Sequence, residues 1–211
     1  MDLGIQSEQH FVSLLSYVVV DESDPAFEDP TKPIGPVYTE AEARDLPYPV
    51  RKTAKGYRRV VVSPKPVTIV EKREIRALID NDFIVICCGG GGIPVVRDGR
   101  SFAGVDAVID KDLASATLAK EAGADIFLIA TDVPGAALHY GTSKERFLRR
   151  LTVSEAQEYS EQEHFPPGSM LPKIEAACQF ISAGGKRAVI TSISDIEAAV
   201  GGEAETEIIP G

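Results

Sequence analysis

Short runs of consecutive apolar residues in this chain alternate with segments whose apolar residues recur with the period of a helix. A continuous apolar run is typical of a strand buried within a sheet, and one occurs at residues 83–88. The largely apolar segments at 14–20 and 125–130 also predict buried strands. Three more strands are expected at 59–62, 187–193 and 205–209. The run at 95–102 has Asp98-Gly99 at its centre, which predicts a β-hairpin.

Helical periodicity appears between most of these strands. We expect helices at 39–46, 69–80, 112–122, 152–161 and 172–183, and a short one after Ser194. Several begin with a capping box, in which a Ser or Thr and a Glu three residues later satisfy free N–H groups. The pairs are Thr39 and Glu42, Thr68 and Glu71, Thr152 and Glu155, and Ser194 and Glu197. This alternation predicts one three-layer α/β/α sandwich over 1–211, with a mostly parallel sheet.

A polar, proline-rich segment at 21–53 interrupts the alternation and contains six prolines. Proline fixes φ and removes a donor, so regular helix is not expected there outside 39–46. A disordered linker is one interpretation. The aromatic residues Phe27, Tyr38 and Tyr48 favour the other, a small packed subdomain inserted in the main domain.

Composition excludes several classes of protein. The 211 residues carry 32 acidic and 22 basic side chains, and a net charge of -10 argues against a nucleic-acid partner. The apolar stretch at 11–20 is too short to cross a bilayer, and the acidic start Met1-Asp2 does not suit a signal peptide. Two of the three cysteines, Cys87 and Cys88, lie in an apolar run, as expected of reduced thiols in a cytoplasmic protein.

Four consecutive glycines directly follow the buried run at 83–88. They are Gly89, Gly90, Gly91 and Gly92. Glycine lets a backbone approach a ligand closely and point N–H groups at an anion, although a flexible loop is the alternative. Ligands of open α/β sheets bind at the carboxyl ends of strands, which favours the anion-binding interpretation. The Walker pattern and the G-x-G-x-x-G pattern are absent from the sequence.

Two lysines lie at the start of predicted helices. Lys111 stands between Asp110 and Asp112, where Asp112 is either an N-cap or part of a site and Lys111 either a surface ion pair or a phosphate ligand. Lys173 follows a rigid glycine-proline loop and enters the first turn of its helix, where the helix dipole disfavours a cation. A bound anion explains such a lysine, and a solvated side chain is the alternative. Together with the glycines, the lysines predict a phosphate site suited to direct phosphoryl transfer.

Five segments of the chain resemble carbamate kinases of the amino-acid kinase superfamily. They read DPAFEDPTKPIGPVY at 24–38, RRVVVSPKP at 58–66, CGGGGIPV at 88–95, GVDAVIDKDLA at 104–114 and GSMLPKIEAA at 168–177. Their order and spacing agree with that family from residue 11 onward. The resemblance implies reversible phosphoryl transfer between ATP and carbamate with Mg²⁺, running from carbamoyl phosphate and ADP to ATP in arginine fermentation, in a cytoplasmic homodimer.

The resemblance also implies roles for single residues. Lys173 would neutralise the transferring phosphoryl group, Lys111 would assist at the phosphates, and Asp112 would hold the lysines in place. Lys32 would be a cation of a lid formed by 21–53, and the four glycines would approach the reacting groups. The residues implied to border the nucleotide are Thr131, Asp132, Val133, Pro134, Gly168, Ser169 and Met170. No protein metal ligand is implied.

One part of the family pattern is absent from these 211 residues. Carbamate kinases begin with a strand followed by a Gly-Gly-Asn loop and later carry a Gly-Asn-Gly loop, and residues 1–10 do not resemble that region. The sequence therefore corresponds to the family without about its N-terminal third. Three functions follow as hypotheses: a carbamate kinase, a nucleotide-binding remnant without catalysis, or a related kinase with another acceptor.

Overall fold

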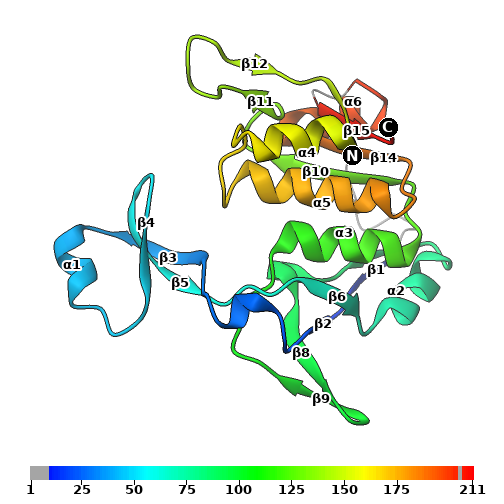
Figure 1. Ribbon diagram of the computed structural model, residues 1–211. Helices are drawn as coiled ribbons and strands as arrows, with labels where there is room; N and C mark the ends of the chain where they lie inside the picture. The colour runs from blue at the N-terminus through cyan, green and yellow to red at the C-terminus, as the bar shows by residue number, and fades with distance from the viewer. Residues whose placement is uncertain (1–9, 204–205) are drawn as a thin grey trace. The chain divides into compact units, whose positions relative to one another are not determined.

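The computed structural model describes residues 10–203 and 206–211 (Figure 1). The chain forms two compact units, Met1–Ala114 and Ser115–Gly211, which are described separately. Helices and β-sheets occur in both, so the α/β class is confirmed. Within the described ranges, the helices all fall short of the length and apolar character that a bilayer crossing requires.

The first unit contains a four-stranded sheet in the order β6-β2-β8-β9. Its strands are β2 (Tyr17–Val20), β6 (Pro66–Ile69), β8 (Ile93–Asp98) and β9 (Ser101–Gly104). β2 runs parallel to β8, and the outer two pairs are antiparallel. Val18, Ile69 and Val95 are buried in its core. The predicted hairpin is confirmed, because β8 and β9 pair around a turn in which Gly99 has a φ of 57°.

A two-stranded parallel sheet pairs β1 (His10–Ser13) with β7 (Phe83–Ile86), and α2 (Lys72–Ile79) packs against β7. The expectation that the run at 83–88 is buried on both faces is wrong. Every second side chain of β7 is exposed, including Ile84 and Ile86, because one face of this narrow sheet has no covering layer in the described structure. The strand expected at 14–20 begins only at Tyr17, and Leu15 is 69% exposed.

The proline-rich segment folds as part of a small packed subdomain rather than a linker. It comprises β3 (Lys32–Tyr38), α1 (Glu40–Arg44), β4 (Val50–Thr53) and β5 (Gly56–Val61), with β5 in the middle of the sheet. The sheet therefore extends past residue 53. β3 accommodates Pro33 and Pro36 because it is an edge strand, which does not need every N–H for pairing.

The second unit is built on a sheet in the order β10-β14-β15-β13. Its strands are β10 (Ile126–Thr131), β13 (Arg150–Thr152), β14 (Arg187–Ser192) and β15 (Thr206–Ile209). β10 and β14 are parallel, and α5 (Met170–Ser182) packs on both, with α4 (Val153–Glu161) beside it (Figure 1). The remaining elements are α3 (Lys111–Ala122), which begins in the first unit, β11 (Ala137–Leu138), β12 (Arg146–Phe147) and α6 (Ile196–Val200).

Parallel and antiparallel pairs are mixed in these sheets, whereas the apolar runs predicted a mostly parallel sheet. The parallel pairs are β1 with β7, β2 with β8, β10 with β14 and β13 with β15. Most antiparallel pairs come from hairpins and edge strands, and one, β14 with β15, joins two inner strands of the second sheet. Glu205, expected in the last strand, lies outside the described residues.

Two of the four predicted capping boxes form, at Thr39 with Glu42 and at Thr152 with Glu155. The box predicted at Thr68 and Glu71 is wrong. Thr68 belongs to β6, and the Glu71 carboxylate accepts a hydrogen bond from the N–H of Tyr17 at 2.9 Å, so α2 starts at Lys72.

The box predicted at Ser194 is also wrong, because the Ser194 hydroxyl bonds to the Ser192 hydroxyl at 2.7 Å. The helix that follows starts at Ile196, and no side chain caps its first turn.

Candidate functional site

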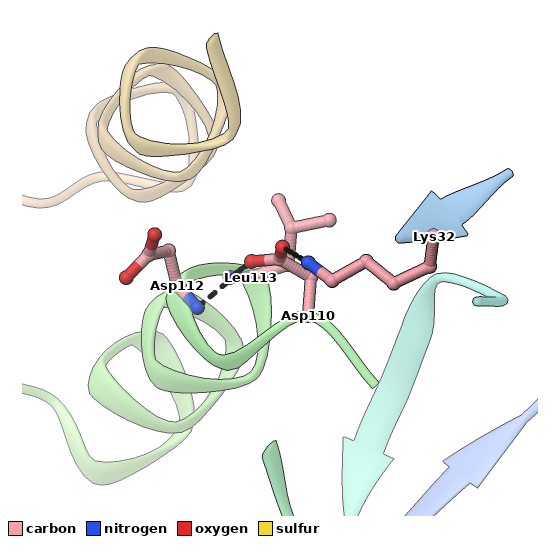
Figure 2. A network of polar contacts seen from close by, with 4 residues as sticks. All are labelled: Lys32, Asp110, Asp112 and Leu113. Carbon is pink, nitrogen blue, oxygen red and sulfur yellow. Dashed lines mark hydrogen bonds and ion pairs between the residues drawn. The ribbon is translucent and has the colours of Figure 1, made fainter. Parts of the chain in front are cut away.

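Lys32, at the first position of β3, forms an ion pair with Asp110, which immediately precedes α3 (Figure 2). The two residues are 78 positions apart in the chain, and their side chains are only 26% and 10% exposed. The ion pair thus connects the proline-rich subdomain to the segment that carries Asp110, Lys111 and Asp112. It is the contact that brings the sequence-predicted Lys32 beside the Asp-Lys-Asp triplet.

Asp110 also caps α3. Its Oδ1 accepts hydrogen bonds from the backbone N–H groups of Asp112 at 2.9 Å and Leu113 at 3.3 Å, which is the pattern of an N-cap residue. Asp112 lies inside the first turn of the helix and is not the N-cap (Figure 2). The residue that holds Lys32 and orients the start of α3 is therefore Asp110.

The electrostatics of Asp110 favour its charged form. Burial opposes ionisation, but the hydrogen bond and the positive charge of Lys32, with the two backbone N–H groups, outweigh it and hold the pKa of Asp110 below its ordinary value. The site therefore contains a buried carboxylate whose charge is matched by a lysine ammonium group.

The four glycines form a tight turn after β7, and they differ in what surrounds them. A Cβ on Gly91 would lie 2.3 Å from the carbonyl oxygen of Ile109, and one on Gly92 would lie 2.5 Å from the Val18 side chain. Gly89 and Gly90 have no atom within 4 Å of the corresponding position. Gly91 and Gly92 are therefore required by packing, whereas Gly89 and Gly90 leave open space in which a ligand can approach the backbone.

The glycine turn, formed by residues 89–92, lies next to the Asp110-Lys111-Asp112 triplet. Gly91 contacts Ile109, the residue before Asp110, and Lys111 is the first residue of α3. In the first unit, the structure thus brings together three sequence features that are far apart in the chain: the glycine turn, the triplet and Lys32. Backbone N–H groups and ammonium groups are the donors that bind phosphate oxygens.

In the second unit, Lys173 lies half-buried in the first turn of α5. Helix α5 begins at Met170, two residues earlier than expected, and no acidic residue is present in its first turn. Gly168 precedes it with a φ of 79° and open space at its Cβ position. The start of α5 therefore combines a left-handed glycine, the N-terminus of a helix and a lysine, which is an arrangement suited to an anion.

The residues expected to border the nucleotide lie at the same edge of the sheet. Thr131 ends β10, and its hydroxyl donates to the Asp132 carboxylate at 3.1 Å. Because α5 leads through a short turn into β14, and β14 is parallel to β10, the start of α5 lies toward the carboxyl end of β10. The loop of Val133 and Pro134 and the segment of Ser169 and Met170 at the start of α5 therefore both lie toward the edge where α/β sheets bind ligands.

Residues 26–192 match the model of the amino acid kinase family, which covers most of the chain. The chain therefore belongs to the amino acid kinase family.

Within it, the resemblance to carbamate kinases is confirmed. The chain is 47% identical over 208 residues to the carbamate kinase of Pyrococcus horikoshii, and 45% identical over 210 residues to that of Trichomonas vaginalis. The alignments cover 96% of this chain and 66% and 67% of those proteins.

Solved structures agree with this assignment. Carbamate kinase from Giardia lamblia bound to AMP-PNP superposes with a TM-score of 0.84 at 44% identity, over 96% of this chain and 66% of that one. The same enzyme bound to citric acid superposes with a TM-score of 0.88. The chain thus has the amino-acid kinase fold and spans about two thirds of the length of the relatives that it matches.

Proposed function

We propose that this protein is a carbamate kinase, which transfers a phosphoryl group reversibly between ATP and carbamate. The observation that carries the proposal is the identity of 44–47% with carbamate kinases along 96% of the chain. The Lys32–Asp110 pair beside an open glycine turn is consistent with it. Phosphoryl transfer needs donors that position and neutralise phosphate oxygens, and these elements supply such donors.

Each lysine has a role in this proposal. Lys173 neutralises the transferring phosphoryl group from the start of α5, and Lys111 assists at the phosphates from the start of α3. Lys32 is the lid cation, and Asp110 sets its position in the absence of substrate. Asp112, the second carboxylate of the triplet, is expected to help hold the lysines in place.

ATP or ADP would lie at the edge of the second sheet, bordered by the loops that follow β10 and precede α5. One relative was solved with AMP-PNP, an ATP analogue. Mg²⁺ would arrive with the nucleotide, because this ion is usually held by substrate phosphates with one or two carboxylates and several waters. Among the described residues, no cluster of three or more His, Cys, Asp or Glu side chains could hold a metal ion by itself.

The same proposal includes the cellular setting. The protein would act in the cytoplasm as a homodimer and convert carbamoyl phosphate and ADP to ATP at the end of arginine fermentation. Its partners would then be small molecules, with neither nucleic acid nor membrane involved.

A second candidate is a nucleotide-binding protein without catalysis. This candidate concerns the 211 residues by themselves, which do not contain the Gly-Gly-Asn and Gly-Asn-Gly loops of the family. A kinase acting on another acceptor is the third candidate, and the close match of the proline-rich subdomain to carbamate kinases argues against it.

One experiment separates the three candidates. ATP formation from ADP and carbamoyl phosphate is measured in a coupled assay, alongside calorimetry with ADP. Protein-dependent ATP formation supports the carbamate kinase. ADP binding without any ATP formation supports the second candidate. Faster ADP release with another carboxylate or with a nucleotide as acceptor supports the third.

A further inference from the structure

The three strands of the proline-rich subdomain carry basic side chains and no acidic ones. Strands β3, β4 and β5 read KPIGPVY, VRKT and GYRRVV, whereas the whole chain has a net charge of -10. Their basic residues are Lys32, Arg51, Lys52, Arg58 and Arg59. A region whose charge is opposite to that of the rest of a protein attracts the ions that the rest repels. This sheet is therefore expected to attract anions.

The register of the strands places three of these basic residues on one face. Residues directly opposite each other on antiparallel strands share a face, and so do alternate residues along a strand. Lys52 lies opposite Tyr57, and Lys32 lies opposite Val61. Arg59 is two residues from each of these partners along β5, so it shares their face. Lys52, Arg59 and Lys32 thus form a diagonal line across the sheet with steps of about 7–8 Å between Cα atoms, which we call the cationic row.

Two residues of the cationic row are accessible to solvent. Lys52 and Arg59 are both exposed. The guanidinium carbon of Arg59 lies 4.8 Å from the ring centroid of Tyr48, whose hydroxyl is hydrogen-bonded to that of Tyr38 at 3.0 Å. This contact orients the guanidinium without neutralising it, because an aromatic ring carries no net charge. These two residues therefore present positive charge to the solvent.

The third residue connects the cationic row to the candidate phosphate site. Lys32 forms the ion pair with Asp110 (Figure 2), which follows the Ile109 that Gly91 contacts. The Lys32 side chain is only 26% exposed, and the Asp110 carboxylate balances its charge. The positive charge that remains uncompensated is thus that of the two exposed residues, and the row ends beside the glycine turn.

The basic residues of the opposite face have partners within the subdomain. Arg51 lies opposite Arg58 in the sheet and forms an ion pair with Asp29. The Arg58 guanidinium donates a hydrogen bond to the carbonyl of Gly35 at 2.8 Å. These contacts are structural, and they make Arg51 a matched control for Lys52, its neighbour in the chain.

We propose that Lys52 and Arg59 draw small phosphate-bearing anions toward the site at Lys32 and raise their affinity for it. That these anions are substrates of phosphoryl transfer rests on the proposed function. A dianion that approaches a chain of net charge -10 is repelled over most of its surface, so a local region of positive potential directs its approach. Arg59 lies within about one Debye length of Lys32 at physiological ionic strength, and Lys52 lies within about two.

The test is an NMR titration of the isotope-labelled chain with inorganic phosphate, in which the amide shifts of Gly89 and Gly90 give the dissociation constant. At an ionic strength of about 0.1 M, where the Debye length is about 10 Å, Lys52→Gln/Arg59→Gln should bind phosphate about 2–5-fold more weakly than the parent. The difference should disappear at about 1 M NaCl, where the Debye length is about 3 Å.

Three further variants separate charge from structure. Arg51→Gln removes one positive charge from the opposite face and should leave the phosphate affinity close to that of the parent. Lys52→Arg/Arg59→Lys keeps both charges and should bind phosphate as the parent does. Lys52→Gln alone leaves the contact between Arg59 and Tyr48 intact, and it should give a smaller loss in the same direction. The amide spectrum of each variant shows that the comparison is made between folded proteins.

Four results would overturn the proposal. They are an unchanged affinity in Lys52→Gln and in the double glutamine variant, a loss that persists at high salt, an equal loss in Arg51→Gln, and a parent chain whose glycine amides do not respond to phosphate. ATP formation is measured separately. A chain that binds phosphate with the expected dependence on charge and salt but forms no ATP would contradict the proposed kinase and leave the cationic row in place.

Discussion

Asp110 is the residue whose importance emerges only from the structure. The sequence presents two aspartates flanking Lys111, and either is able to cap a helix. The structure distinguishes them, since Asp110 accepts two backbone N–H groups and holds Lys32 across 78 positions of the chain. One available signal was the position of Asp110 directly after the apolar residues Val108 and Ile109, which places it at the boundary between buried backbone and helix.

The first prediction concerns Asp110→Asn. Removing the charge of the buried Asp110 carboxylate should lower the free energy of unfolding by about 1–3 kcal/mol near pH 7. Because the folded-state pKa of Asp110 lies below its ordinary 3.8, the contribution is present above about pH 4. It is lost as the pH falls further through the folded-state pKa. Urea unfolding at several pH values measures the difference.

The control for this variant is Asp106→Asn, an exposed carboxylate in the same segment. Its unfolding free energy should change much less. An Asp110→Asn variant as stable as the parent at pH 7 would contradict the role of the ion pair.

The second prediction concerns Lys173→Ala, which should remove nearly all of the phosphoryl transfer that the chain performs. Removing one preorganised charge from a site where charge develops typically costs about 10²–10³ in rate. The coupled ATP-formation assay measures it, with the exposed Lys120→Ala as control. Activity within a few-fold of the parent would show that Lys173 is not at the reacting group.

At the scale of elements, the glycine turn shows that identical residues have different reasons to be present. Gly91 and Gly92 are packed against backbone and side chains, whereas Gly89 and Gly90 face open space. From the sequence alone, the two packed glycines cannot be told apart from the two that face open space. Only the approach of Ile109 and Val18, which come from other parts of the chain, distinguishes them.

A third prediction follows for this turn. Gly91→Ala should destabilise the fold strongly, because the new methyl group would lie 2.3 Å from a backbone oxygen and the φ of 103° disfavours any side chain. Gly90→Ala, at a φ of 69° with open space, should cost only about 1–2 kcal/mol. Thermal unfolding of the two variants compares them directly. Equal losses of stability would contradict the packing described for Gly91.

The proline-rich subdomain is the second element whose behaviour is predicted. Its sheet has its own pairing, and Lys32 connects it to Asp110 through one ion pair. We expect residues 21–53 to act as a lid that closes when substrates bind. Hydrogen exchange with and without ADP and carbamoyl phosphate measures this motion. Identical protection across the segment in both states would exclude a lid.

At the scale of the whole molecule, binding and catalysis should be separable in these 211 residues. The motifs implied for the nucleotide are present, whereas the two glycine-asparagine loops of the family are absent from the sequence. Positioning both reactants contributes about 7–11 kcal/mol to lowering a barrier, so transfer without those loops should be slow. We expect calorimetry to detect ADP while ATP formation stays low. Turnover as fast as in the full-length relatives, or folded protein that does not bind ADP, would contradict this prediction.

Local sequence determined the elements that depend on neighbouring residues. The capping boxes of α1 and α4 formed as predicted, because each joins residues three positions apart. The hairpin of β8 and β9 also formed at its Asp-Gly turn. The family motifs likewise identified the class of protein, whereas the roles that they imply for the glycines and lysines stay predictions.

Tertiary structure decided the features that depend on distant residues. Thr68 and Glu71 have the spacing of a capping box, yet pairing with β2 draws Thr68 into a strand and the Glu71 carboxylate to Tyr17. Pairing with β5 likewise turns the proline-rich segment Lys32–Tyr38 into an edge strand, and the fold brings Lys32 into an ion pair with Asp110. The physical reason is that capping and turn energies act within a few residues, whereas burial and strand pairing depend on which distant segment arrives alongside.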